Sequence, residues 1–144
     1  MSPKNRGFTV VELVTIIVIA GILAAVAAPR FFSRDTFASR GFYDQVISTL
    51  RYAQKAAIAE HRYVCVAIAA NSVTLTQGTT AACGGALASP AGAASYSVTA
   101  PSGITVGVAN FNFNALGQPS AAQSIAVSGY GTPITVEPET GYVH

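Results

Sequence analysis

The sequence predicts an α+β protein in which a long N-terminal α-helix, transmembrane in its first half, packs by its second half on a C-terminal antiparallel β-sheet head. Three observations predict this fold class. The run from Leu13 to Ala28 contains no charged residue, a helical pattern of apolar residues extends to Glu60, and from Val64 the apolar residues recur at every second position. Turn residues separate the later apolar segments at short intervals, as in an antiparallel sheet.

The composition argues against an ordinary soluble domain. The 144 residues suit one domain with a modest core, but they are 51% hydrophobic and 10% charged, with a mean hydropathy of +0.44. Soluble domains are typically about 25% charged. Part of the apolar excess lies in the uncharged N-terminal run, and the rest is Ala and Val in the C-terminal half. The N-terminal run therefore has to lie in lipid or inside an assembly.

The charges are distributed unevenly along the chain. The formal net charge is +2, and without Lys4 and Arg6 the remaining basic and acidic residues balance. Every other basic residue precedes Tyr63, and the charged residues of 63–144 are Glu137 and Glu139. Because nucleic-acid binding depends on clustered Lys and Arg, we do not expect a nucleic-acid partner.

The N-terminal residues combine a short basic leader with an apolar helix. From Phe8 to Ala28 is 21 residues, which as a helix span about 31 Å, the thickness of a bilayer core. Lys4 and Arg6 precede this run, so the N-terminus is expected to stay cytoplasmic and the bulk of the chain to lie outside the inner membrane.

Two ordinary interpretations compete for this segment. One is a secretory signal cleaved near Ala25-Val26-Ala27, and the other is a plain transmembrane anchor. Neither accounts for Glu12. A carboxylate in an apolar helix costs roughly 2.5–3.5 kcal/mol at the bilayer centre, less near its edge, and usually marks a function.

The junction between leader and helix resembles the processing motif of type IV prepilins, in the run Arg6-Gly7-Phe8-Thr9-Val10-Val11-Glu12-Leu13. The resemblance implies that a membrane peptidase cleaves after Gly7 and methylates the new N-terminus, Phe8. It also implies that Glu12 of an incoming subunit pairs with the Phe8 amine of a neighbour. Both charges are costly in an apolar bundle unless they are paired, so this pairing would select one axial register.

The same resemblance extends along the helix. Gly21 and Pro29 match the small-residue and proline positions of the pilin helix and are the expected kink positions. Because Pro29 lacks an amide donor and disfavours helix at the residue before it, a kink or local melting is expected there. The chain then divides into four parts, which are a cleaved leader (1–7), a transmembrane and assembly helix (8–29), an amphipathic continuation (30–61) and a β-rich head (62–144).

The continuation is predicted to bury one face against the head. Its apolar residues are spaced by four, three and four positions: Val46, Leu50, Ala53 and Ala57. Basic side chains on another face form either a contact stripe or, in the favoured interpretation, a solvated surface: Arg51, Lys55 and Arg62. Gly41 is a second weak point of the helix.

The head is predicted to begin with a hairpin, Val64–Ile68 and Val73–Thr76, that turns at Asn71-Ser72. Residues 78–95 are expected to form a loop. Further strands are expected at Tyr96–Thr99, Ile104–Val108, Phe111–Phe113, Ser124–Val127, Pro133–Glu137 and Tyr142-Val143.

Two cysteines, Cys65 and Cys83, lie in the predicted head. In an exported chain an even number of cysteines suggests a disulfide, and two unrelated buried thiols are the alternative. The bond would close a loop of about 19 residues and contribute roughly 3 kcal/mol to stability.

The whole chain resembles minor pilins and pseudopilins of the GspH/FimT family, in the order of helix, strand and hairpin and in two further runs, Phe111-Asn112-Phe113-Asn114-Ala115-Leu116-Gly117 and Ile134 to Val143. Residues 30–32 and 36–45 most resemble a minor pilin of the mannose-sensitive haemagglutinin pilus. The resemblance implies a type IV pilin fold and a minor pilin that initiates or modulates pilus assembly. A type II secretion pseudopilin is the alternative, and a major adhesive pilin or a DNA-binding tip pilin is less expected, since relatives that bind DNA use basic residues near the C-terminus.

The implied partners are the bacterial inner membrane, prepilin peptidase and other pilins. The implied location is a single pass through the inner membrane, with a periplasmic head, and then the pilus at the cell surface.

The sequence offers little for catalysis. Its histidines are His61 and His144, and it contains neither a glycine-rich phosphate loop nor a Gly-x-Ser-x-Gly elbow. His61 and Cys65 lie four residues apart, but two ligands do not make a zinc site, so a structural histidine at the end of the helix is the favoured interpretation. We expect no enzyme activity, cofactor, metal or small-molecule substrate.

Overall fold

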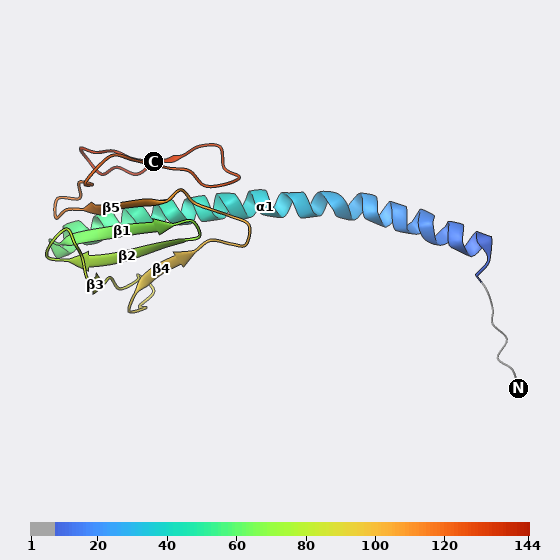
Figure 1. Ribbon diagram of the computed structural model, residues 1–144, viewed down its shortest axis with the longest axis horizontal. Helices are drawn as coiled ribbons and strands as arrows, with labels where there is room; N and C mark the ends of the chain where they lie inside the picture. The colour runs from blue at the N-terminus through green and yellow to red at the C-terminus, as the bar shows by residue number, and fades with distance from the viewer. Residues whose placement is uncertain (1–7) are drawn as a thin grey trace, which may run out of the picture. The chain divides into compact units, whose positions relative to one another are not determined.

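The computed structural model describes residues 8–144, and of residues 27–35 it describes the backbone alone. Helix α1 (Val10–Glu60) is followed by short strands (Figure 1). These are β1 (Tyr63–Ala69), β2 (Ser72–Gly78), β3 (Gly85–Ala86), β4 (Tyr96–Thr99), β5 (Ala109–Phe113), β6 (Gln123–Ile125) and β7 (Ile134–Val136). The chain forms two compact units, one that ends at Arg34 and one from Asp35 to His144, which we call the head unit.

Helix α1 runs without interruption through Gly21, Pro29 and Gly41. The local melting expected at Pro29 is therefore wrong. A proline inside a helix removes one backbone hydrogen bond, and the good helix formers around it, mainly Ala, maintain the remaining bonds. The kinks expected at Gly21 and Pro29 stay predictions.

The end of α1 is set by His61. This residue has a positive φ of 51°, its amide donates to the Ile58 carbonyl at 3.4 Å, and the Arg62 amide donates to the Ala57 carbonyl at 3.2 Å. These two bonds form a Schellman motif, in which the left-handed position is usually glycine. His61 is thus placed as a structural residue at the helix end, as the sequence predicts.

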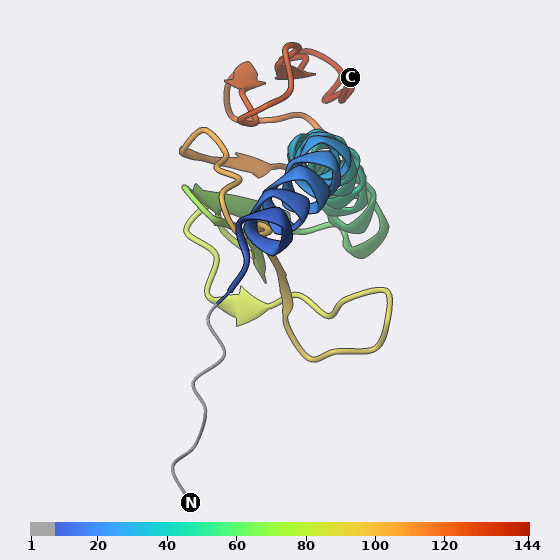
Figure 2. The same ribbon diagram turned by 90° about the vertical axis from the view of Figure 1, so that its right-hand side faces the viewer.

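The head unit is built on an antiparallel sheet with the strand order β3-β2-β1-β5, and β4 pairs with β2 beside β3. Strands β1 and β2 form a hairpin in which Ala69 pairs with Ser72, so the turn is Ala70-Asn71, one residue earlier than expected. Strands β6 and β7 form a separate two-stranded sheet. Figure 2, which looks along the helix, shows the main sheet on one side of α1 and the C-terminal segment beyond the β5 edge.

The core of the head unit lies between α1 and the inner face of the sheet. The four helix residues predicted to be buried are fully buried: Val46, Leu50, Ala53 and Ala57. The alternating residues of the hairpin face them and are at most 2% exposed: Val64, Val66, Ile68, Val73 and Leu75. Each fully buried Val, Leu or Ile contributes about 1.5–3 kcal/mol, so this layer accounts for the packing of the helix on the sheet.

Three predictions about strands are wrong. The strand expected at Tyr142-Val143 is a single bridge between Val143 and Val136. Residues 104–108 form no strand, and Val106 makes a single bridge to Val127, although Ile104 and Val106 are both buried. Pairing there is limited to this bridge, in which the Gly107 amide donates to the Ala126 carbonyl and the Ser128 amide to the Thr105 carbonyl, both at 2.8 Å. The Val106 amide points to the other side and donates to the Ala70 carbonyl in the β1–β2 turn at 2.9 Å. Conversely, strand β3 lies inside the segment expected to be a loop, where its backbone pairs with the free edge of β2.

Candidate functional site

The first part of α1 presents apolar side chains on every face. From Phe8 to Val26, each large hydrophobic side chain is at least 49% exposed, and Phe8 is 73% exposed. A helix that is apolar all round is normally covered by lipid or by other chains, because leaving such a surface in water is costly. Among the residues that the structure describes with side chains (8–26 and 36–144), no helix is long and apolar enough to cross a membrane.

The N-terminus of α1 is capped by Thr9. Its hydroxyl oxygen accepts a hydrogen bond from the Glu12 amide at 3.2 Å, and the Leu13 amide donates to the Thr9 carbonyl at 3.1 Å. Thr and Glu three residues apart are typical of a capping box, of which the structure shows the half made by the Thr9 hydroxyl. Glu12 also lies in the first turn, where the helix dipole favours a carboxylate. Sequence reasoning missed this capping role of Thr9, although the pattern Thr-x-x-Glu could have indicated it.

The predicted processing residues lie on both sides of the first described residue. Gly7 and the leader lie outside the described residues. Phe8 and Thr9 precede α1, and Glu12 is exposed in its first turn. At Gly21 an added Cβ would meet nothing within 4 Å, so packing inside the chain does not require glycine there.

The two predicted cysteines form a disulfide in the head unit. The sulfur atoms of Cys65 and Cys83 are 2.04 Å apart and their Cα atoms 6.1 Å apart. The bond joins β1 to the loop that follows β2. Gly78 lies against this loop, because a Cβ at Gly78 would be 2.8 Å from the Cys83 Cα.

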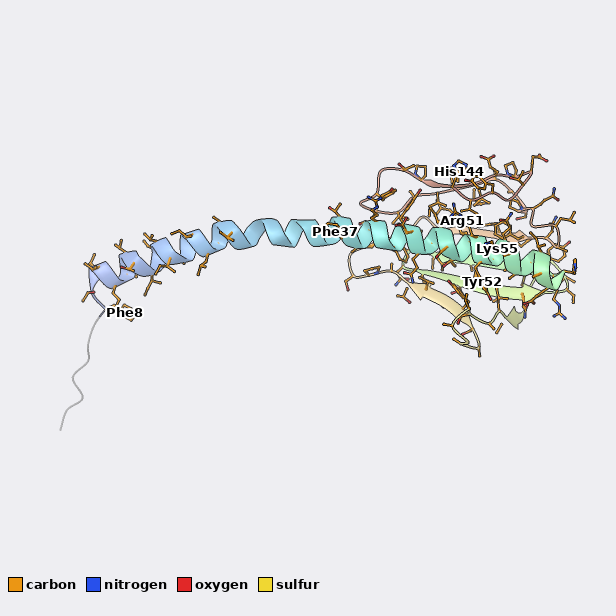
Figure 3. All side chains as sticks on the ribbon, turned by 180° about the vertical axis from the view of Figure 1, so that it is seen from behind. Phe8, Phe37, Arg51, Tyr52, Lys55 and His144 are labelled. Atoms are coloured by element: carbon orange, nitrogen blue, oxygen red, sulfur yellow. A yellow bond between two sulfur atoms is a disulfide. The ribbon has the colours of Figure 1, made fainter. Side chains whose placement is uncertain are left out.

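The C-terminal segment is held on α1 by side chains that donate to its backbone. Arg51 donates to the Val143 carbonyl from Nε at 3.2 Å and from Nη2 at 2.9 Å. Gln54 Nε2 donates to the Thr140 carbonyl at 2.8 Å and to the Gly117 carbonyl at 3.2 Å. Arg51 is therefore a docking residue of the fold, whereas Lys55 remains on the exposed face that the sequence predicts (Figure 3).

An open groove of about 540 Å³ follows the outer face of α1, lined by Asp44, Ile47, Ser48, Arg51, Tyr52 and Lys55. Its lining includes neither histidine nor cysteine. Elsewhere, His144 Nε2 lies 3.1 Å from Glu137 Oε1 in an exposed pair. In the part of the chain that the structure describes, no cluster of His, Cys, Asp and Glu could hold a metal ion.

Comparisons with known proteins address the N-terminal segment. Residues 2–28 match the family model described as the prokaryotic N-terminal methylation motif. The type IV major pilin protein PilA of Myxococcus xanthus (strain DK1622) is 37% identical over 59 residues, 41% of this chain. The N-terminal segment of this chain is therefore similar to that of type IV pilins. The match covers 27% of the relative's length, and no solved structure matches the chain significantly.

A helix followed by an antiparallel sheet is accordingly an α+β type IV pilin-like fold. Pilins are structural subunits and not a family of enzymes. The apolar helix and the segment that matches the methylation motif, rather than a pocket in the head unit, are therefore the candidate functional site.

Proposed function

We propose that this pilin-like protein is a minor type IV pilin, a structural subunit that initiates or modulates pilus assembly. Prepilin peptidase cleaves it after Gly7 and the new N-terminus, Phe8, is methylated. Residues 8–29 hold the subunit in the inner membrane, with the head in the periplasm, until it joins the pilus at the cell surface. The single observation that supports this proposal is a helix with exposed apolar side chains on every face and one carboxylate, Glu12, in its first turn.

The capping geometry is compatible with cleavage after Gly7. Thr9 and Glu12, which form the cap, both follow the scissile bond, so the mature helix keeps its N-terminal hydrogen bond. Cleavage adds an ammonium group at Phe8, directly before the cap. The ammonium group then lies four residues before Glu12, close to the first turn of the helix.

The Glu12 carboxylate is available for a contact with a neighbouring subunit. Thr9 already accepts the bond from the Glu12 amide, and the described contacts include no hydrogen bond or ion pair to the Glu12 carboxylate. In a bundle of apolar helices an unpaired charge costs several kcal/mol, whereas a pair with good geometry recovers most of that cost. Pairing Glu12 with the Phe8 amine of a neighbour would therefore favour one axial position of the incoming subunit over all others.

The test is incorporation of a Glu12→Val variant into sheared pili in cells that contain prepilin peptidase. We expect normal cleavage, because the peptidase acts before Phe8, and a loss of the variant from the filament fraction. Glu60→Gln is the matched control, since Glu60 is an exposed carboxylate at the opposite end of α1 and should not affect incorporation. Wild-type levels of Glu12→Val in the filaments would refute the pairing role.

A major pilin is the second candidate, because the Myxococcus xanthus relative is a type IV major pilin. The similarity covers 59 residues and thus less than half of this chain. The ratio of this subunit to the most abundant pilin in sheared fibres separates the two roles. A minor pilin is a small fraction of the fibre, and a major pilin is its bulk. Presence in a periplasmic secretion filament, with absence from pili, would instead indicate a type II secretion pseudopilin.

A further inference from the structure

The main sheet of the head unit has one face that does not contact α1. Alternate residues of β1 and β5 are buried toward the helix, so the residues between them point to the opposite side, which we call the outer face. Figure 2 shows α1 on the other side of the sheet. A molecule can therefore contact the outer face without disturbing the core.

Two rows of paired residues cross the outer face over β5, β1 and β2. Each row has a polar residue at either end and a small residue between them: Asn112, Cys65 and Thr76 in one row, and Asn110, Ala67 and Thr74 in the other. Neighbouring strands lie about 4.8 Å apart, and alternate residues of one strand about 7 Å apart. The polar residues thus frame an area of roughly 10 Å by 7 Å with a low floor, because the side chains at its middle are short.

Two loops make this area a hollow of about 390 Å³. On one side, the Ser120 amide donates to the Asn112 carbonyl at 2.8 Å, and the Asn112 amide donates to the Ser120 hydroxyl oxygen at 3.3 Å. On the other side, Ala81 and Ala82 line the hollow, and the Ala81 carbonyl oxygen lies 3.2 Å from Cys65 Sγ. The disulfide therefore positions this wall. Small-molecule sites usually have volumes of about 300–1,000 Å³, so the hollow has room for a small ligand.

The hollow presents hydrogen-bonding groups that the chain does not use itself. In the described part of the chain, the side chains of Thr76, Asn110 and Asn112 make no hydrogen bond to another residue. Each carboxamide has two donor hydrogens and one acceptor oxygen, and a hydroxyl both donates and accepts. A ligand that matches these three side chains must therefore offer donors and acceptors close together.

The hollow is also uncharged. Residues 63–136, which include the residues that line it, contain no Asp, Glu, Lys, Arg or His. A charged ligand would find no partner for its charge in this lining, and nucleic acid in particular depends on Lys and Arg. An apolar ligand is matched poorly as well, because the bulkiest lining residues, Val66 and Phe111, are buried.

We propose that the outer face binds a neutral oligosaccharide in this hollow, through the side chains of Thr76, Asn110 and Asn112. Adjacent sugar hydroxyls carry no charge and offer donors and acceptors close together, as the three side chains require. A neutral extended peptide is the poorer match, because peptides add to the edge of a sheet, where backbone groups are free, and not to its face. The inference goes beyond the proposed function, since it concerns the head unit alone.

The test uses the full-length protein in a detergent without a sugar headgroup, so that the detergent does not compete for the hollow. The protein is applied to an array of immobilised neutral oligosaccharides, with sialylated and sulfated oligosaccharides as comparators. We expect retention on neutral members of the array that salt does not weaken, because no ion pair contributes to binding. Retention on the acidic oligosaccharides alone, or on no member of the array, would overturn the proposal.

Ala67→Val and its matched control Ala69→Val separate binding from folding. Both alanines are exposed on the outer face of β1, and valine favours strands, so neither substitution should lower Tm. Ala67 lies on the floor of the hollow, whereas Ala69 lies outside its lining. Ala67→Val should therefore weaken retention at least tenfold and Ala69→Val should not change it. Equal retention of the two variants would mean that the sugar binds elsewhere, which would overturn the proposal.

The two carboxamides are tested by calorimetric titration with the neutral oligosaccharide that the array retains most strongly. Asn110→Ala and Asn112→Ala should each weaken binding about fivefold, the effect of losing one hydrogen bond. Asn71→Ala is the matched control, because it removes an exposed carboxamide in the β1–β2 turn, and it should leave the affinity unchanged. Wild-type affinity in both variants of the hollow would refute the assigned contacts.

Discussion

Removal of the disulfide between Cys65 and Cys83 should destabilise the head unit strongly. The two residues are 18 positions apart, and a bond that closes a loop of about 19 residues contributes about 3 kcal/mol through loop-closure entropy. The loop also leads into β3 and the 1% exposed Leu87, so its release frees packed residues. For a unit of this size, about 4 °C per kcal/mol converts the loss to a fall in Tm of about 12 °C.

Thermal unfolding of the full-length Cys65→Ser/Cys83→Ser double variant in detergent, followed by near-ultraviolet circular dichroism, measures this effect. The tyrosine rings that supply the signal lie mostly in the head unit, for example Tyr52 stacked on Tyr96 at 5.3 Å. Wild type treated with reductant should unfold at the Tm of the variant, and the variant should not respond to reductant. A Tm within about 2 °C of the oxidised wild type would refute the loop-entropy reasoning.

Three further substitutions test local features of the head unit. His61→Gly should raise Tm, because a positive φ of 51° costs a residue with a β-carbon about 1 kcal/mol and costs glycine little. A lower Tm would contradict the Schellman assignment. Arg51→Gln should increase amide exchange of the C-terminal segment about fivefold, because Val143 loses its guanidinium donor, whereas Lys55→Gln should leave exchange unchanged. Gly117→Ala should lower the free energy of unfolding by about 1–2 kcal/mol, and with it the urea midpoint, because the φ of Gly117 is 80°. An unchanged midpoint would contradict the expected backbone strain.

The helix and the hairpin could be predicted because the spacing of their apolar side chains matches the period of a helix or a strand. The four-three-four spacing that ends at Ala57 marks the buried helix face, and alternation from Val64 to Ile68 marks the inner face of β1. Strand β3 could not be predicted, since Gly85 and Ala86 pair through backbone groups that every sequence carries. For Ile104–Val108 the alternation correctly indicates burial, but the choice between a ladder and a single bridge depends on distant residues.

Some features of the candidate site could likewise be predicted from the sequence, and others could not. The processing motif, the apolar helix and the cysteine pair can be read directly from residue types and spacing. The double contact of Arg51 with Val143 could not, because a backbone carbonyl 92 positions away leaves no sequence pattern. The Thr9 cap has a sequence pattern, Thr-x-x-Glu, from which it could have been predicted.

Intact mass and N-terminal sequencing, on the protein from membranes of cells with and without prepilin peptidase, test most directly whether this chain is a processed pilin subunit. We predict a mature chain that starts at N-methylated Phe8 only where the peptidase is present. A chain that starts at Ala28 would indicate a secreted domain, and an uncut chain that starts at Met1 would indicate a simple anchor. Either result would contradict the proposed assembly role of Glu12.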